Sequence, residues 1–389
     1  MIKDAMDLQI KMQQYRRDFH KYPELGFQEH RTSSKVIEVL ESLGCRVRQN
    51  VGKTGVVGEL GQGQPIVAIR ADMDALPLQE ENQTEYASQI PGVMHACGHD
   101  AHTAILLGVA EILSKEKKLP GTVRFIFQPA EEVADDEGIS GAPRMIQDGA
   151  MDGGVALVLA LHVSAHVPVG QIHIGAGPAS GGVDTFRASI LGMGGHGARP
   201  HETIDPIYLS AYVILALNGI VSRKLNPFDS AVVSIGSINA GFAENVIPNK
   251  VDILGTLRYT DPKIQERIHA EIKRAFEVTK TLGGDYELKF EIGTPPMIND
   301  EKAAELIRQT AVDLLGENNV GTPPQGLGAE DFGCFSELAP GAMFSLGSMV
   351  EGDEREHHNS RFDINDLCLP YGASILAETT LRFLRNGGF

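Results

Sequence analysis

The chain has 389 residues, of which 42% are hydrophobic and 22% are charged. This length exceeds what one ordinary hydrophobic core supports, so we expect two domains with a well-packed interior. The 34 basic and 51 acidic side chains give a formal net charge of −17. Such a charge argues against a nucleic-acid partner, because binding to phosphates depends on Lys and Arg. It still permits locally positive pockets for a small anionic substrate.

The N-terminal stretch MIKDAMDLQIKMQQYRRDF mixes charged with apolar residues and lacks the continuous apolar region of a secretory signal. The most apolar stretch, AYVILALNGIVS, is shorter than the roughly 18 residues that a transmembrane helix needs. The four cysteines have no paired spacing, which argues against a disulfide framework; they are Cys45, Cys97, Cys334 and Cys368. We therefore expect a cytoplasmic protein with reduced thiols and no membrane partner.

Apolar periodicity predicts helices over about 4–20 and 30–43. A buried strand follows in PIVAIRADMDALP and ends in acidic residues, and a helix runs from about Ala101 to Lys115. The strands TVRFIFQPAEE and VALVLALHV come next, with Glu or His near their ends. Strands that alternate with helices and carry polar groups at their carboxyl ends are typical of an open α/β sheet whose ligand site lies along that edge.

The order of elements changes after Gly181. Residues 184–293 predict strand, helix, strand, strand, helix, strand, which is the order of a ferredoxin-like domain. Helices near 300–316 and 366–386, around the strand AMFSLGS, then resume the first pattern. We therefore predict an α/β catalytic domain with a mixed sheet flanked by helices, made of residues 1–180 and 293–389. An inserted ferredoxin-like α+β lid or dimerisation domain is expected at 181–292.

The segment MHACGHDAH places Cys97 and His99 on a turn that contains glycine. Thiolate, imidazole and carboxylate groups bind borderline-soft divalent metals. Other predicted strand ends supply further groups of this kind, namely Asp72, Asp74, Glu131, Glu132 and His162. Burying carboxylates costs free energy unless they are paired or metal-bound. From the residues alone, two alternatives remain open. Cys97 would be a buried apolar residue beside incidental histidines, and the carboxylates would be unrelated surface groups.

Ten segments in chain order carry a resemblance to a known family: RRDFHKYPELGFQE, IRADMDALP, MHACGHDAHTA, FQPAEE, LHV, GGHGARPHETIDPI, ENVIPN, GTLRY, GAEDF and HHNSRFDIND. The chain resembles the metal-dependent N-acyl-amino-acid amidohydrolases, which include hippurate hydrolases, N-acetyl-diaminopimelate deacetylases, auxin-conjugate hydrolases and small bacterial carboxypeptidases. The resemblance runs nearly end to end. It implies two divalent metal ions, which would be zinc, manganese, cobalt or nickel.

The resemblance also implies a ligand set. The thiolate of Cys97 would bridge the two ions, where relatives outside this branch use an aspartate. His99 and His162 would complete the protein ligands of one ion, and Glu132 and His358 those of the other. His358 is preferred to its neighbour His357 because the family spacing counts back from the FD of SRFD.

Further roles follow from the same resemblance. Glu131 would be the general base that takes a proton from the attacking water and passes it to the leaving nitrogen. Asp74 and Asp100 would orient imidazole ligands. For Asp100, capping of the helix that follows is an equally good alternative.

The inserted domain is expected to contribute to the same site. His196 in GMGGHGARPH matches the residue that in relatives polarises the substrate carbonyl, often from a partner subunit. Asn245 and Arg258 match positions that recognise the free carboxylate of the substrate, and a structural salt bridge is the alternative for Arg258. We therefore expect a homodimer or homotetramer. The segment VADDEGISGAPRMI, which follows the Glu pair, departs from the family pattern and leaves the acyl group undefined. Glu244 also departs from the pattern, and it is expected to alter the preference near the carboxylate site.

These observations predict a dinuclear-metal hydrolase that cleaves the amide bond of N-acyl amino acids, of the aminoacylase or deacetylase type. A dipeptidase or carboxypeptidase acting on short peptides is the alternative within the enzymes. Two hypotheses belong to other classes. One is a non-catalytic protein that binds amino-acid conjugates, and the other is a redox protein that uses Cys97 as a reactive thiol of low pKa without metal.

Overall fold

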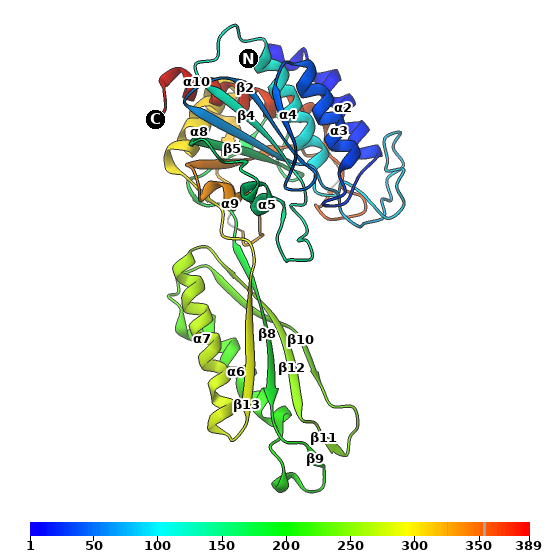
Figure 1. The fold of residues 1–389 in the computed structure, drawn as a ribbon, viewed down its shortest axis with the longest axis vertical. Coiled ribbons are helices and arrows are strands. Elements are labelled where there is room, and N and C mark those ends of the chain that lie inside the picture. Colours follow the sequence, from blue (N-terminus) through cyan, green and yellow to red (C-terminus); the bar gives the residue numbers. More distant parts are fainter. Residues whose placement is uncertain (325, 353–354) are drawn as a thin grey trace. The chain divides into compact units, whose positions relative to one another are not determined.

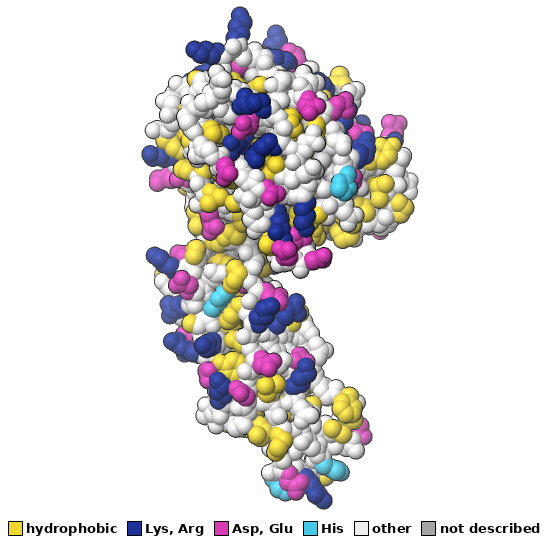
Figure 2. Space-filling view, in the orientation of Figure 1, with side chains coloured by type: hydrophobic (Ala, Val, Ile, Leu, Met, Phe, Trp, Pro, Cys, Tyr) yellow, Lys and Arg dark blue, Asp and Glu magenta, His cyan; other side chains and the backbone are white. Residues whose placement is uncertain are grey.

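The computed structural model describes residues 1–324, 326–352 and 355–389. The chain divides into two compact units, each with its own hydrophobic core. Unit 1 consists of Met1–Ala179, Ile298–Pro324 and Asp331–Phe389, and unit 2 of Ser180–Met297 with the short segment that ends at Glu330. Figure 1 shows the elements of both units. On the face seen in Figure 2, Lys and Arg side chains are interspersed with Asp and Glu and form no continuous basic surface.

Unit 1 is built on a sheet with the strand order β1-β2-β4-β3-β5-β16-β6-β15. Its strands are β1 (Arg46–Val51), β2 (Gly55–Gly61), β3 (Ile66–Asp72), β4 (Thr122–Gln128), β5 (Val155–Ser164), β6 (Ile172–His173), β15 (Val320–Gly321) and β16 (Gly341–Gly347). The pairs β3–β4, β3–β5, β5–β16 and β6–β15 are parallel, and the others are antiparallel. The short strands β7 (Gly177–Pro178) and β14 (Ile298–Asn299) pair separately.

Helices cover this sheet. They are α1 (Ile2–Met6), α2 (Gln9–Lys21), α3 (His30–Ser42), α4 (His99–Ser114), α5 (Gly141–Gln147), α8 (Glu301–Leu315), α9 (Phe332–Ser336) and α10 (Leu369–Asn386), with 3-10 turns at Glu317–Asn319 and Asp366–Cys368. α4 is buried along nearly its whole length and packs against the sheet, α2 and α10. The short helices α5 and α9 pack on each other, below the sheet in Figure 1. The predicted mixed sheet flanked by helices is thus confirmed.

The strand order explains why distant motifs meet. β3 lies between β4 and β5 and is parallel to both, so the carboxyl ends of the three strands lie along one edge of the sheet. All residues of β3 and of β4 are buried, as expected for parallel strands covered on both faces. The polar residues near the ends of these strands are therefore brought together at that edge.

Unit 2 has a four-stranded antiparallel sheet in the order β10-β12-β8-β13. Its elements are β8 (Gly182–Leu191), β9 (Gly195–His196), a 3-10 turn (Pro200–Glu202), α6 (Pro206–Lys224), β10 (Ala231–Ala240), β11 (Val246–Ile247), β12 (Lys250–Tyr259), α7 (Pro262–Thr281) and β13 (Asp285–Ile292). Buried side chains of α6 and α7, such as Leu209, Leu217 and Ile272, form a core with the apolar side of this sheet.

Helix α6 contains the apolar stretch AYVILALNGIVS. The whole helix, Pro206–Lys224, is longer than this stretch, and within the described residues it is the one helix that is long and apolar enough to cross a membrane by length and composition. A single helix of this kind is weak evidence for a membrane span, because core helices of soluble proteins can have the same length and composition. The buried side of α6 packs on the sheet of unit 2 through Leu209, Val213 and Leu217.

Two local features differ from the sequence prediction. The first predicted helix is interrupted, since α1 ends at Met6 and α2 begins at Gln9, with Leu8 buried in the core. The hairpin of β1 and β2 is absent from the prediction, because RVRQNV has mostly exposed polar side chains and no apolar alternation.

Candidate metal centre and active site

The predicted ligands come from four segments of unit 1. Cys97 lies just before α4, His99 is the first residue of α4, and His162 lies near the end of β5. Glu132 follows β4, and His358 lies in the loop before α10. The turn between Cys97 and His99 depends on Gly98, whose φ is +95°. A Cβ at this position would lie 2.3 Å from Cγ2 of Val163, so only glycine fits.

The sulfur of Cys97 belongs to two groups of potential metal ligands. One group joins it to His99 and His162, and the other joins it to Glu132 and His358; within each group the ligand atoms lie within 4.8 Å of one another. Sγ of Cys97 is 3.5 Å from Nε2 of His162, and Nε2 of His358 is 3.0 Å from Oε1 of Glu132. One thiolate shared by two sets is the arrangement that a bridging ligand requires.

The hydrogen bonds of Nδ1 in His99 and His162 leave Nε2 of each ring as the nitrogen that can bind a metal. Nδ1 of His99 lies 3.0 Å from the carbonyl oxygen of Asp74 and 3.1 Å from its carboxylate, both of which only accept, so this nitrogen carries the proton. Nδ1 of His162 likewise donates to the carbonyl of Val163 at 2.8 Å. Nε2 of His99 is buried and makes no hydrogen bond to any described residue, although Oδ2 of Asp72 lies 3.6 Å away. A buried ring nitrogen left in this way fits a bound cation.

The thiol of Cys97 is protonated as long as no cation is bound. Burial raises the pKa of its thiol, although the nearby imidazole of His99 acts in the opposite direction. A thiol of raised pKa is a poor nucleophile, which argues against a reactive cysteine that functions without metal. A bound cation would displace the proton, so metal binding is expected to release one.

Asp74 contacts a residue of each ligand group. It is buried, its Oδ1 accepts from Nδ1 of His99, and its Oδ2 accepts from the backbone N–H of Glu132 at 3.0 Å. Asp100 has a different environment, because its described hydrogen-bond partners are Arg16 and His20 and none of the predicted ligands. Nor does the side chain of Asp100 cap α4, since the N-cap position is Gly98.

The carboxylate of Glu131, the predicted base, lies within 4.8 Å of ligand atoms of His99 and Glu132. Its Oε1 accepts from the backbone N–H of Asp331 at 3.4 Å. The residue before it, Ala130, has a φ of +46°, which is costly for a residue other than glycine. The backbone N–H of Ala130 donates to Oε1 of Glu29 at 2.9 Å, and this contact holds the strained turn.

The residues predicted from the inserted domain all lie in unit 2. His196 on β9 pairs with Val246 on β11, and the carbonyl of Asn245 accepts from the N–H of Gly197, so His196 and Asn245 are close neighbours. Both side chains are exposed. Arg258 lies elsewhere, near the end of β12. Among the described residues, no carboxylate forms an ion pair with Arg258, so the structural salt bridge considered for it is not seen.

Comparison with known proteins shows which family this chain resembles. Residues 68–382 match the model of "Peptidase family M20/M25/M40". The N-acetyl-L-cysteine deacetylase of Bacillus subtilis is 38% identical over 95% of this chain and 87% of its own. Thermostable carboxypeptidase 1 of Saccharolobus solfataricus is 38% identical over 98% of this chain and 97% of its own.

A solved structure agrees. The YXEP protein of Bacillus subtilis, described as a dinuclear metal binding peptidase from the M20 family, has a TM-score of 0.85 and 33% identity over 98% of this chain and 99% of its own. The chain belongs to peptidase family M20. The predicted resemblance is confirmed, and with it the class of metal-dependent hydrolases that act on amide bonds.

Several polar residues around this M20 site are not singled out by the sequence analysis. Nδ1 of His102 donates to Asp72 at 2.6 Å, and its Nε2 accepts from the N–H of Val163 at 2.9 Å, which ties α4 to β3 and β5. Asp331, whose N–H donates to Glu131, accepts in turn from Arg70 and Gln128. The sequence could have indicated these residues, because they are polar residues that occur within the quoted motifs or within strands that are otherwise apolar.

His357, the alternative to His358, has a different environment. Its ring lies 5.3 Å from that of His162 and 4.8 Å from that of Phe362, measured between centroids. Burial lowers the pKa of His357 to about 3, whereas the contact with Glu132 raises the pKa of His358. His358 therefore faces a carboxylate of the ligand set, and His357 packs beside it.

Proposed function

We propose that this M20 protein is a dinuclear-metal hydrolase that cleaves the amide bond of N-acyl amino acids with a free carboxylate. The observation that carries the proposal is the position of Cys97, whose sulfur is shared by the ligand group of His99 and His162 and the ligand group of Glu132 and His358. The relatives named for N-acetylcysteine deacetylation and for dinuclear metal binding support it.

Two divalent cations held by these residues would lower the pKa of a water molecule and polarise the amide carbonyl. Glu131 accepts the proton of the attacking water and later delivers it to the leaving nitrogen. Its carboxylate is oriented for this by the N–H of Asp331 and by the turn that Glu29 holds at Ala130. Asp74 keeps His99 in the tautomer whose Nε2 can bind a cation. We propose zinc, manganese, cobalt or nickel as the metal.

Recognition of the substrate is proposed to come from unit 2. The guanidinium of Arg258 is suited to a bidentate contact with the free carboxylate, and Asn245 would assist it. His196 would polarise the scissile carbonyl. We propose that unit 2, at about 181–292, is a ferredoxin-like lid inserted between the two parts of the catalytic domain, 1–180 and 293–389.

The positions of these residues within unit 2 support a homodimer. His196 lies beyond the Lys250 end of β12, because the N–H of Gly194 donates to the side chain of Asn249 at 2.9 Å. From Lys250 to Arg258 the strand covers about 26 Å at roughly 3.3 Å per residue. An N-acyl amino acid is too small to contact both His196 and Arg258 of the same copy of unit 2. We therefore propose that one of these two side chains comes from a second copy of the chain.

An apolar surface of unit 2 is suited to that second copy. Exposed side chains of α6 include Tyr208, Tyr212 and Leu215, and Leu215 is 73% exposed. The strand β10 is an edge of the sheet, and its exposed residues include Val232 and Ile238. Edge strands and exposed apolar helix faces are usually covered in the functional assembly. A homotetramer would need a further interface.

The alternative activity is that of a dipeptidase or carboxypeptidase, which the relative named as a carboxypeptidase supports. We propose a cytoplasmic location, in keeping with cysteines that form no disulfide among the described residues. We also propose small-molecule substrates rather than nucleic acid or membrane as partners, in keeping with the net charge of −17.

The test is hydrolysis of N-acetyl and N-benzoyl amino acids and of dipeptides by chelator-stripped protein, with zinc, manganese, cobalt or nickel added back singly. Cleavage of the N-acyl amino acids after addition of metal is the expected result. Cleavage of dipeptides alone would favour the alternative. Two bound ions without cleavage of any substrate would favour a non-catalytic binding protein.

A further inference from the structure

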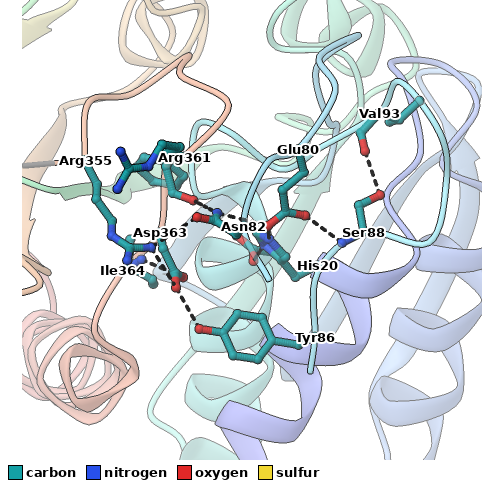
Figure 3. Close-up of polar contacts among 12 residues, drawn as sticks. His20, Glu80, Asn82, Tyr86, Ser88, Val93, Arg355, Arg361, Asp363 and Ile364 are labelled. Atoms are coloured by element: carbon teal, nitrogen blue, oxygen red, sulfur yellow. Dashed lines mark hydrogen bonds and ion pairs between the residues drawn. The ribbon is translucent and has the colours of Figure 1, made fainter. Parts of the chain in front are cut away.

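A cluster of buried charged and polar side chains lies outside the proposed ligand set. We call it the Arg16 cluster, and it joins α2, the loop 76–96, the start of α4 and the loop that carries His358. Figure 3 shows much of this cluster, with side chains of the two loops pointing toward one another. Its members are Arg16, His20, Glu80, Asn82, Tyr86, Asp100 and Asp363.

Arg16 is the centre of the cluster. Its side chain is fully buried, and its guanidinium donates to Asp100 at 2.8 Å and to Asp363 at 2.7 Å. Asp100 belongs to the first turn of α4, next to His99, whereas Asp363 follows His358 by five positions. A buried charge is tolerated only when it is paired, so these contacts fix the start of α4 and the end of the His358 loop to the same side chain.

Tyr86 adds a second attachment for the His358 loop. Its hydroxyl donates to Oδ2 of Asp363 at 2.7 Å. Its ring lies 4.9 Å from the guanidinium of Arg16, the same guanidinium that binds Oδ1 of Asp363. Oδ1 of this carboxylate is therefore held by Arg16 and by the backbone N–H of Ile364. Oδ2 is held mainly by Tyr86, since the guanidinium of Arg355 is farther away, at 3.5 Å.

Asn82 and its neighbour hold the residues just before Asp363. The side-chain amide of Asn82 donates to the carbonyl of Phe362 at 2.9 Å, and the N–H of Glu81 donates to the carbonyl of Ser360 at 2.9 Å. The loop 76–96 therefore holds three of the four residues in the segment 360–363, because Glu81, Asn82 and Tyr86 bond to them.

The conformation of His358 depends on such attachments. Its side chain is 54% exposed, and its φ of +59° is unfavourable for residues other than glycine. A conformation of this kind persists only when the surrounding structure holds the backbone. The N–H of His358 donates to the carbonyl of Ala96 at 2.8 Å, and the segment 360–363 holds the chain on the carboxyl side.

We propose that Tyr86 and Asn82, acting through Asp363 and Phe362, are positioning residues for the ion that Glu132 and His358 would hold. This inference rests on the proposed function. The ion that His99 and His162 would hold depends less on the segment 360–363, because those ligands lie on α4 and β5. Loss of the Tyr86 hydroxyl should therefore weaken one metal site and leave the other unchanged.

The test is Tyr86→Phe in the full-length protein. It removes the hydroxyl that donates to Asp363 and keeps the ring over Arg16. Chelator-stripped protein is titrated with zinc, and His358→Ala, titrated in parallel, identifies the binding step that belongs to the Glu132–His358 site. We expect the affinity of that step to fall about tenfold, at the lower end of the range for partners that orient ligands, and the other step to stay within about twofold.

The matched control is Tyr286→Phe in unit 2, which also removes a hydrogen bond from a tyrosine to a carboxylate, at 2.6 Å to Glu277. It should alter neither binding step. Asn82→Ala is a second variant, which loses the bond to Phe362 and should repeat the selective loss. For both Tyr86→Phe and Asn82→Ala, excess zinc should restore turnover.

Other outcomes would overturn the inference. Unchanged affinity of both steps in Tyr86→Phe would show that the hydroxyl does not position His358. Equal weakening of both steps, together with a lower unfolding temperature of the metal-free protein, would show a merely structural role. Wild-type protein that binds no zinc, manganese, cobalt or nickel would instead overturn the proposed function, and the inference with it.

Discussion

The buried carboxyl of Glu29 offers a prediction with a defined dependence on pH. Glu29 is fully buried, and its carboxyl accepts from the N–H of Ala130 and from the hydroxyl of Thr54. Burial, with a smaller contribution from the charge of Asp74, raises the pKa of Glu29 from 4.5 to about 7. The folded protein thus keeps this proton at a pH where the unfolded chain has lost it.

The sign of the effect follows from this difference. Between pH 4.5 and about 7 the unfolded state binds fewer protons at Glu29 than the folded state does, so stability falls as pH rises through this window and stays lower above it. At about 1.4 kcal/mol per pH unit, the free energy of unfolding falls by at most about 3 kcal/mol across this window. Glu29→Gln keeps an acceptor for Ala130 and removes the titration.

We therefore expect Glu29→Gln to be more stable than wild type at pH 8, by up to about 3 kcal/mol, and closer to wild type at pH 5. For a domain of this size that corresponds to a rise of about 6 °C in the unfolding temperature. The assay is thermal unfolding of the metal-free protein at both pH values, with Glu38→Gln on the exposed side of α3 as control. A difference between Glu29→Gln and wild type that does not change with pH would refute the reasoning.

Three further predictions concern the site. Glu131→Gln should bind two ions like wild type and lose about 10²–10⁴-fold in kcat, because the base is removed while the ligands remain; substantial turnover with both ions bound would place the base elsewhere. Cys97→Ala should bind fewer ions by elemental analysis, whereas Cys45→Ala, which removes a cysteine outside the ligand groups, should bind as wild type; two ions retained in Cys97→Ala would contradict bridging. Arg258→Ala should raise KM for N-acyl amino acids more than for the matching amides without a carboxylate, and equal effects on both substrates would exclude carboxylate recognition.

The principal strands and helices could be predicted from the sequence because their apolar patterns are strong. The buried strands β3, β4 and β5 are largely continuous apolar runs, and the polar groups near their ends could be expected at one edge of the sheet. The choice of metal ligands came from the family resemblance, which periodicity does not supply. The polar strand β1 has no apolar pattern, and its position is set by pairing with β2, which in turn pairs with β4.

The partners of the site residues were harder to predict. The family resemblance implies that Asp100 orients an imidazole ligand, yet its carboxylate lies against Arg16 of α2. Glu29 and Ala130 are far apart along the chain, and their contact depends on how the start of α3 packs beside the turn after β4. Residue type and spacing along the chain report what a side chain can bind. They do not report which distant backbone group it will meet, because that depends on packing between elements.

The proposed metal centre combines two kinds of segment. Cys97, His99 and His162 lie at or near the ends of α4 and β5. Glu132 follows β4 after the strained turn at Ala130, which the contact with Glu29 holds. His358 lies in a loop with a strained backbone, and its position depends on contacts that reach α2 and the loop 76–96. A site built in this way should lose its ions in order as its surroundings are weakened, with the ion near His358 lost first. Loss of the ion near His358 alone should already stop hydrolysis, because activation of the water requires both ions to be bound.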